Sequence, residues 1–412
     1  MISTSGPGLT FIFLLLVPLF FSIPIALATA EMTTIMPVEG GFYRWSRAAL
    51  GDFWGFQCGW WNWTGTFLMS TSYGVAMADY LDAWIPMHSR LEHWTVAVLF
   101  LVLVGGINML GVRLVGNLTL GLLLAMFVPI LVFIFLGYSH AHFNPVLPIF
   151  PAGRPWREAY GVGLALALWS YSGYEQLSTV IEEVEKPEHN FPLGLGIVVP
   201  LTIATYVLTL SAGLAALGNW KAWETGYMVT AARMIGGAGL GTAMFVASVI
   251  ANFILLDSTV LSVTRVPLTM AEDGYLHPAL AKISHRFGTP VRSIALSTAL
   301  CAPLALFSVP QLIAVYAWSR MATSLLTLIS FWQLRRKYPD LPRSFRVAGG
   351  NLGALGIVIV PALLFAWAMI NSDPAARVWG MVNLVSGPLA FAWVWRKRSA
   401  AIAASLSSSS GR

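Results

Sequence analysis

The sequence predicts an all-α protein that crosses a membrane many times. Hydrophobic residues make up 57% of the 412 residues and charged residues only 10%, whereas soluble domains are about a quarter charged. Apolar runs of about 20 residues recur along the chain, and an α-helix needs about this length to cross a bilayer. Strands of a membrane β-barrel would instead alternate apolar and polar residues over about ten positions. The composition therefore excludes a soluble fold and favours a polytopic helical bundle.

Eleven apolar segments, each bounded by glycine, proline or charged residues, are predicted to form the spans. The division of two neighbouring segments beside Pro310 is the point on which this count depends. We expect residues 1–398 to form one transmembrane domain and residues 399–412 to form a disordered cytoplasmic tail. The predicted spans are 9–36, 52–80, 94–111, 117–138, 159–181, 193–217, 236–263, 291–309, 311–333, 352–371 and 376–395.

The basic residues predict how the chain is oriented. Most of the 24 Lys and Arg residues fall on the side of the membrane that holds the loop with Arg44 and Arg47, and cytoplasmic loops carry such an excess. We therefore expect a multi-pass protein of the plasma membrane with a cytoplasmic C-terminus. An odd number of spans then leaves Met1 outside, which points to a further helix upstream. Because the basic residues are scattered among short loops, the net charge of +6 does not indicate nucleic-acid binding.

Nothing in the residue pattern predicts a cofactor or a metal site. Cys58 and Cys301 lie in different apolar segments, and His140 and His142 have no third ligand nearby. A phosphate-binding loop of the kind that ATP-driven transport requires is also absent from the sequence. The spans hold no converging nucleophile and base, so we do not expect an enzyme.

The stretch ALWSYSGYEQLSTV, residues 167–180, is the most unusual part of the predicted spans. Its serines and glycine permit local unwinding of a helix, and a carboxylate at membrane depth indicates a functional site. Its aromatic side chains can gate a pocket or hold a cation. Close helix packing and a snorkelling carboxylate are the structural alternatives. The substrate-binding candidates here are Ser170, Tyr171, Ser172, Gly173, Tyr174 and Glu175.

Three other spans supply further candidates. Asn62 and Thr66 share one helical face, and Asn252 precedes a second intramembrane acid, Asp257. Arg320 lies within a span and must find an anion or water. It can pair with one of the acids, or it can clamp a substrate carboxylate.

The two intramembrane acids bear on the substrate. Unneutralised, they would attract a polyamine or a cationic amino acid, whereas pairing with Arg320 leaves at most one net negative charge. Glu175 is therefore either the counter-ion of an amine substrate or the partner of Arg320.

Several stretches resemble the amino acid/polyamine/organocation (APC) superfamily of permeases, in particular its polyamine and L-type amino acid transporter branches. Residues 22–63, with PVEGGFY, resemble the second and third helices of that family. The others are INMLGVRLVGN (107–117), GYEQLSTVIEEVEKPEHNFP (173–192), TMAEDGYLHPALAKISHRFGTP (269–290) and LRRKYPDLPRSFRVAGG (334–350). The resemblance implies a LeuT-like inverted repeat of five plus five helices and two extra helices, with the substrate between the first and sixth.

Residues 1–36 already match the second helix of the family, so the chain is expected to contain helices 2–12. The first helix is missing, either because the start codon has been assigned too late or because the protein is a shortened form. Polyamine-type relatives also carry an acid at the position of Asp257, whereas relatives usually carry an uncharged residue at that of Arg320.

We therefore expect secondary-active transport of amino acids by alternating access, coupled to protons through Glu175 or Asp257. Polyamine transport is the alternative, and a transport-inactive fragment or sensor is the alternative of another class. The expected partners are a small amine or amino acid, protons and the lipid bilayer, and the sequence is silent on an accessory subunit.

Overall fold

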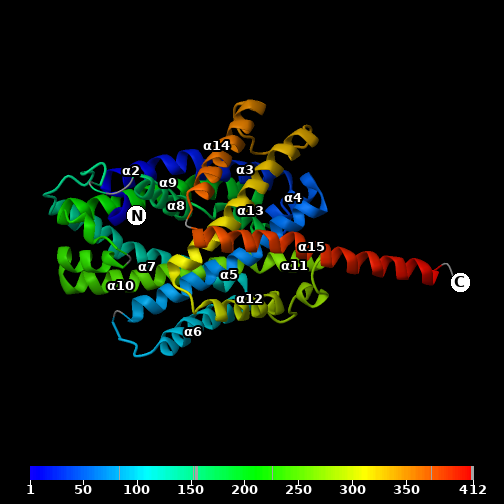
Figure 1. Ribbon diagram of the computed structural model, residues 1–412, viewed down its shortest axis with the longest axis horizontal. Helices are drawn as coiled ribbons and strands as arrows, with labels where there is room; N and C mark the ends of the chain where they lie inside the picture. Colours follow the sequence, from blue (N-terminus) through cyan, green and yellow to red (C-terminus); the bar gives the residue numbers. More distant parts are fainter. Residues whose placement is uncertain (83, 152, 154–155, 225, 373, 410–412) are drawn as a thin grey trace.

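The computed structural model describes residues 1–82, 84–151, 153, 156–224, 226–372 and 374–409, and every regular element in these ranges is a helix (Figure 1). The side chains of residues 112–115, 156–158, 162, 165 and 398–409 lie outside this description. In the described part of the chain, eight helical segments are long and apolar enough to cross a membrane. The prediction of an all-α polytopic protein is confirmed. The eight segments are Pro7–Ile35, Arg90–Met109, Gly116–Ser139, Pro187–Leu217, Tyr227–Glu272, Val309–Lys337, Gly350–Ile370 and Pro374–Lys397.

The other three predicted spans are also helical but depart from a simple apolar helix. The helix α5 (Asp52–Asp82) is long but rich in polar and small residues, and α12 (Val291–Leu304) has only 14 residues. The third is interrupted, with α8 (Trp156–Ser170) followed by the 3₁₀-helix η2 (Tyr174–Glu183). The break beside Pro310 is real, because α13 (Val309–Lys337) begins there with a capping box between Ser308 and Gln311.

The chain order of the remaining elements follows the predicted spans. The helix α15 extends to Ser409, into the range 399–412 for which the sequence predicts a disordered tail, and the division at residue 398 stays a prediction. Figure 1 shows the last turns of α15 projecting beyond the other helices. The elements are α1 (Ile2–Ser5), α2 (Pro7–Val17), the π-helix η1 (Pro18–Ser22), α3 (Ile23–Ile35), α4 (Phe42–Leu50), α6 (Arg90–Met109), α7 (Val112–Ser139), α9 (Pro187–Leu217), η3 (Trp220–Ala222), α10 (Tyr227–Val263), α11 (Arg265–Glu272), η4 (Pro278–Ala281), α14 (Gly350–Ile370) and α15 (Pro374–Ser409).

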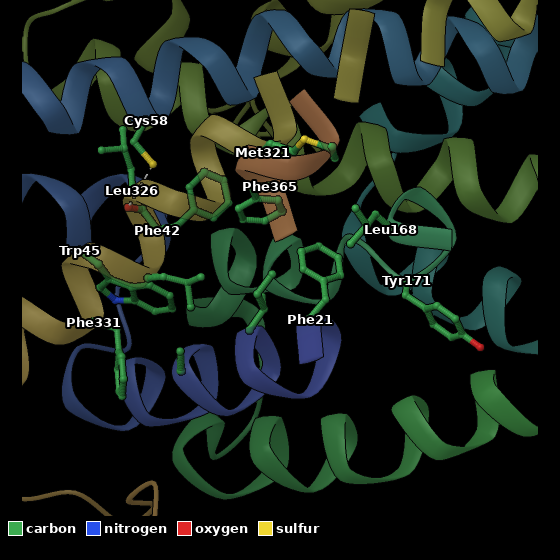
Figure 2. Packing of buried hydrophobic residues seen from close by; sticks show 14 of the residues in the cluster. Phe21, Phe42, Trp45, Cys58, Leu168, Tyr171, Met321, Leu326, Phe331 and Phe365 are labelled. Atoms are coloured by element: carbon green, nitrogen blue, oxygen red, sulfur yellow. Dashed lines mark hydrogen bonds between the residues drawn. The ribbon is translucent and has the colours of Figure 1, made fainter. Parts of the chain in front are cut away.

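Two of the apolar helical segments are more buried than the others. The apolar windows of α2–α3 and α13 are mostly buried, whereas those of α7, α9 and α15 contain few buried residues. Figure 2 shows aromatic side chains from these two segments and from α4, among them Phe21, Phe42, Trp45 and Phe331, in one buried cluster. The exposed windows are apolar, as helices facing lipid must be.

The π-helical turn of the first segment packs against the break in the α8–η2 segment. Pro18 has no N–H, so the carbonyl of Leu14 loses its helical donor, and the Tyr171 hydroxyl donates to that carbonyl at 2.9 Å. In return, the Ser22 hydroxyl donates to the carbonyl of Tyr171 at 2.9 Å. Both interrupted helices thus satisfy backbone groups that a bilayer could not solvate.

The turn between α3 and α4 packs directly on η2. Gly41 has a φ of 35°, and a Cβ at this position would overlap with the hydroxyl and the carbonyl of Ser178. The backbone of Gly40 donates a hydrogen bond to the carbonyl of Thr179 at 3.1 Å. Glycine in the PVEGGFY motif therefore allows a close backbone approach that positions η2.

The variant Gly41→Ala should lower the thermal unfolding midpoint of the detergent-solubilised protein by several degrees more than Gly51→Ala does. Both glycines have positive φ, so each alanine carries backbone strain of about 1–3 kcal/mol, but nothing lies within 4 Å of a Cβ at Gly51. Equal shifts for the two variants, measured by size-exclusion fluorescence after heating, would contradict the close approach.

Candidate functional site

The helix that carries the ALWSYSGYEQLSTV stretch is broken at its centre. It ends as an α-helix at Ser170 and resumes at Tyr174 as a 3₁₀-helix, with Gly173 at a φ of 113°. The hydroxyl of Ser170 donates to the carbonyl of Leu166, and that of Ser172 donates to the carbonyl of Trp169. The predicted unwinding is therefore present. The 3₁₀ segment η2 is itself kinked at Val180, whose φ and ψ are not helical, and a 3₁₀ stretch within a helix often marks a functional hinge.

An ion pair between Glu175 on η2 and Arg320 on α13 lies immediately after this break. The two side chains are only 1% and 4% exposed, and Ser324 donates a hydrogen bond to Glu175 Oε1 at 2.8 Å. Of the two sequence hypotheses for Glu175, the structure has it as the partner of Arg320. Each unpaired charge would be costly at this depth, so the pair holds η2 against α13.

Several polar atoms of the ion pair make no hydrogen bond. Glu175 Oε2 is buried without a hydrogen-bond partner, and so are Arg320 Nε and Nη1. Native proteins rarely leave such groups unsatisfied, and unsatisfied groups call for an explanation such as an absent ligand. A free carboxylate oxygen next to free guanidinium N–H groups presents an acceptor and donors side by side.

The polar face of α5 meets η2 beside this pair. Asn62 Nδ2 donates to Gln176 Oε1 at 3.3 Å, and Asn62 Oδ1 is buried without a partner. Thr66 donates to the carbonyl of Asn62 at 2.8 Å, which turns its hydroxyl back onto its own helix. Asn62 thus contacts the residue that follows Glu175 on η2, and a shared role of the two residues in lining a substrate cavity stays a prediction.

Other predicted site residues lie apart from the ion pair. The Tyr171 hydroxyl is bound to α2, and Figure 2 shows its ring turned away from the labelled cluster. Tyr174 packs with Ile181 and Phe191, in a cluster that joins η2 to α3 and α9. Asn252 donates to a carbonyl of its own helix. Their roles in substrate binding stay predictions.

Asp257 is buried in α10 and faces α6 and α7 rather than α13. Asn108 Nδ2 donates to its Oδ1 at 2.6 Å, and the Thr119 hydroxyl donates to its Oδ2 at 2.8 Å. The two intramembrane acids therefore occupy separate polar environments, of which only that of Glu175 contains a described cation.

Sequence reasoning missed four polar partners in these two environments. Ser324 lies one helical turn after Arg320, a spacing that places both on one face, and Gln176 directly follows Glu175. Asn108 lies within the INMLGVRLVGN junction that the sequence singled out, and Thr119 follows two residues after it. Each is an ordinary polar residue, and only the packing of distant helices shows which carboxylate it meets.

A cavity of about 610 Å³ opens at the end of the bundle that holds α4, and we call it the α4 vestibule. Arg44 and Arg47 both bind Asp273 at its edge, each at 2.8 Å. The Glu39 backbone N–H donates to the Glu182 carboxylate at 2.9 Å. The vestibule is lined by Met36, Val38, Glu39, Arg44, Arg47, Ala48, Asp52, Glu182 and Glu272.

Burial raises the pKa of Glu39 in the α4 vestibule to about 7. The carboxylates of Glu183, Glu182 and Glu272 raise it further, whereas the nearby Arg265 guanidinium opposes the rise. Glu39 therefore titrates near neutral pH at this end of the bundle.

The ion pair predicts a non-additive pair of substitutions. Glu175→Gln or Arg320→Met alone leaves one buried charge unpaired, which costs about 3–5 kcal/mol, whereas the double variant leaves none. We therefore expect the double variant to unfold at a higher temperature than either single variant. Glu272→Gln, in a half-exposed pair with Arg44, serves as control and should shift the unfolding midpoint little. Additive losses in the Glu175–Arg320 cycle would contradict the pairing.

The raised pKa of Glu39 predicts a pH dependence of stability. The folded state binds the proton on Glu39 more tightly than the unfolded state, in which the pKa of this carboxyl group has its ordinary value of 4.5. The stabilisation is therefore complete below that value and is lost as pH rises through about 7. Thermal unfolding midpoints measured across this window should fall with rising pH less steeply in Glu39→Gln than in the wild type or in the exposed Glu185→Gln. Identical slopes in all three proteins would refute the assignment.

Comparisons with known proteins agree with this architecture. The sequence model of the amino acid permease family matches residues 1–393. A probable polyamine transporter of Arabidopsis thaliana is 30% identical over 388 residues, which cover 93% of this chain and 80% of that relative. The polyamine transporter PUT1 of Oryza sativa subsp. japonica is 29% identical over 375 residues, which cover 89% of this chain and 68% of that relative.

A solved structure shows the same fold at low identity. MhsT, in complex with L-phenylalanine, aligns with a TM-score of 0.60 and 15% identity, covering 90% of this chain and 93% of MhsT. The LeuT-like fold expected from the motifs is thereby confirmed. The matched family and these relatives are transporters and not enzymes. Since the family match extends over nearly the whole length, the chain belongs to the amino acid permease family and is a multi-pass membrane transporter.

Proposed function

We propose that this permease moves zwitterionic amino acids by secondary-active transport with alternating access. The observation that carries the proposal is the buried Glu175–Arg320 pair with its unused hydrogen-bonding groups. An amino acid has one ammonium and one carboxylate on adjacent positions. Its ammonium matches the free Glu175 Oε2, and its carboxylate matches the free N–H groups of Arg320.

The charge of the pair favours a zwitterion over a polycation. Glu175 and Arg320 sum to zero, and a substrate with one charge of each sign leaves that sum unchanged. Desolvating a net charge at membrane depth costs several kcal/mol, so a matched exchange of partners is the least costly way to load the site. Arg320 also repels any purely cationic substrate at short range.

The broken helix supports the same proposal. Between Ser170 and Tyr174 the regular hydrogen bonding of α8 stops, and half-helix ends expose amides and carbonyls that can bind a substrate carboxylate and ammonium. We expect substrate there, with Asn62 on α5 facing it. The excess of basic residues at one side supports a cytoplasmic position for the α4 vestibule and the C-terminus, and we propose the plasma membrane as the location.

Polyamine transport is the second candidate because two of the relatives carry that name. A polyamine has no carboxylate, so it would leave Arg320 without a new partner when it engages Glu175. For this reason the geometry ranks it below an amino acid.

Uptake into proteoliposomes separates the two candidates. Wild-type protein should take up labelled leucine. Other zwitterionic amino acids should compete with this uptake, and putrescine should not. Arg320→Gln should lose at least about tenfold in leucine uptake, because the buried guanidinium contact to a carboxylate contributes more than about 1.4 kcal/mol. Arg320→Lys, which keeps the charge, should retain more uptake than Arg320→Gln.

Two outcomes would overturn the proposal. Preference of the wild type for putrescine, with uptake raised by Arg320→Gln, would establish polyamine transport. Failure of well-folded wild-type protein to move leucine, arginine or putrescine would favour the sensor or inactive-fragment alternative.

A further inference from the structure

Asp257 stands out among the buried charged groups because its environment contains hydrogen-bond donors but no described cation. Its side chain is fully buried, and its two carboxylate oxygens accept from Asn108 and Thr119 at 2.6 and 2.8 Å. An ionised carboxylate without a counter-ion is energetically costly within a membrane helix. A proton removes that cost without requiring any further partner.

Several described charged groups on the elements packed against α10 pair with groups other than Asp257. On η2, Glu175 is bound to Arg320. Glu183, also on η2, pairs at 3.2 Å with Arg265, the first residue of α11. On α6, His93 lies at the far end and pairs with Asp79. Among described side chains, none of the cations on these elements reaches Asp257.

The other titratable side chains described on these elements make contacts with groups other than Asp257. On α5, Cys58 contacts the carbonyls of Phe42 and Thr323, and the Tyr73 ring belongs to the cluster around Met69. On α7, Tyr138 bonds Ser211, and on α9 Tyr206 bonds the carbonyl of Ser170. Among the described side chains, Asp257 therefore meets only the neutral groups of Asn108 and Thr119.

Asn108 can serve both protonation states of this carboxyl group. As placed, its Nδ2 donates to the ionised form, and its Oδ1 is buried without a partner. The amide nitrogen and oxygen differ by a half-turn of the side chain. After that turn Oδ1 accepts the hydrogen of a protonated Asp257, and the Thr119 hydroxyl can still donate to the other oxygen.

The same contacts do not fit a metal cation. Sodium and calcium are held by the lone pairs of several oxygens, whereas here the amide and the hydroxyl direct hydrogens at the carboxylate. Donor-to-acceptor distances of 2.6 and 2.8 Å leave no space for an ion between them. The chemistry of the environment favours a proton.

We infer that Asp257 is the binding site of the coupling proton, with Asn108 and Thr119 as its positioning residues. The inference rests on the proposed secondary-active transport and assigns the proton to α10, leaving Glu175 for the substrate. A proton from one aqueous side forms an O–H bond on the Asp257 carboxylate, and the same bond breaks on the other side to return the proton to water.

A hydrogen bond joins α10, the helix that carries Asp257, to η2. The Thr179 hydroxyl on η2 donates to the carbonyl of Ser262 at 2.6 Å, and Ser262 lies little more than one turn beyond Asp257 on α10. Because η2 also carries Glu175, a shift of α10 on protonation is transmitted to the residue that binds the amine. Proton and substrate thus act on one shared element.

The test compares gradient-driven accumulation with exchange in proteoliposomes. For a neutral zwitterion moved with one proton, a pH difference of one unit drives accumulation of up to about tenfold. Asp257→Asn should lose this accumulation and keep exchange of labelled for unlabelled leucine, because the amide mimics the protonated carboxyl. Thr259→Val is the matched control, since its hydroxyl is exposed and bonds only its own helix, and it should behave as the wild type.

Substitutions of the positioning residue supply an independent readout. Thr119→Val should shift the external pH of half-maximal accumulation, and Thr119→Ser should restore the wild-type value. Unchanged profiles, or gradient-driven accumulation that persists in Asp257→Asn, would overturn the inference. Accumulation driven by sodium and indifferent to pH would overturn it as well.

Infrared difference spectra between acid and alkaline pH test the proton site without substrate. The wild type should show the carbonyl stretch of a buried protonated carboxyl group, and Asp257→Asn should lack it. If the wild type moves no substrate but shows this band, the proposed function fails and the proton site stands. If substrate moves and the band is unaffected by Asp257→Asn, the proton site fails and transport stands.

Discussion

An arginine buried at membrane depth must bind an anion, and this requirement joins α13 to η2. Arg320 is supplied by α13, the most buried of the late helices, and Glu175 by the 3₁₀ half of a broken helix. Neither charge is tolerable alone in such a site. Their pairing therefore sets the position of η2 relative to α13, and the free donors and acceptor that remain define what kind of substrate can approach.

The break that creates η2 depends on a second set of interactions with the same physical cause. Backbone groups freed from a helix have no water to bind inside a bilayer, so other protein groups must bind them. Tyr171 and Ser22 exchange hydrogen bonds between the interruption at Pro18 and the interruption after Ser170. Two irregular segments far apart in sequence thus stabilise one another, which explains why proline and serine lie where they do.

Glu175, Asp257 and Glu39 have different surroundings, and these surroundings suit different roles. Glu175 has a fixed cation and unused hydrogen-bonding capacity, which suits recognition of a substrate. Asp257 has donors on both oxygens and no described cation, which suits reversible binding of a proton. Glu39 lies in the lining of the α4 vestibule, where burial raises its pKa to about 7.

The sequence by itself determined the fold class, the approximate spans and the place of the helix break. These depend on composition, on the length of apolar runs and on glycine and serine, all of which are local properties. It also named Glu175, Asp257 and Arg320, because a charge inside an apolar run is visible without a structure. Only the tertiary structure decided which acid Arg320 binds, since residues 145 positions apart meet through helix packing. For the same reason the sequence did not indicate Ser324, Asn108 and Thr119 as partners of these acids, nor that the Tyr171 hydroxyl donates a hydrogen bond to α2. Polar residues of ordinary type acquire a role only when the fold places a particular carboxylate or carbonyl beside them.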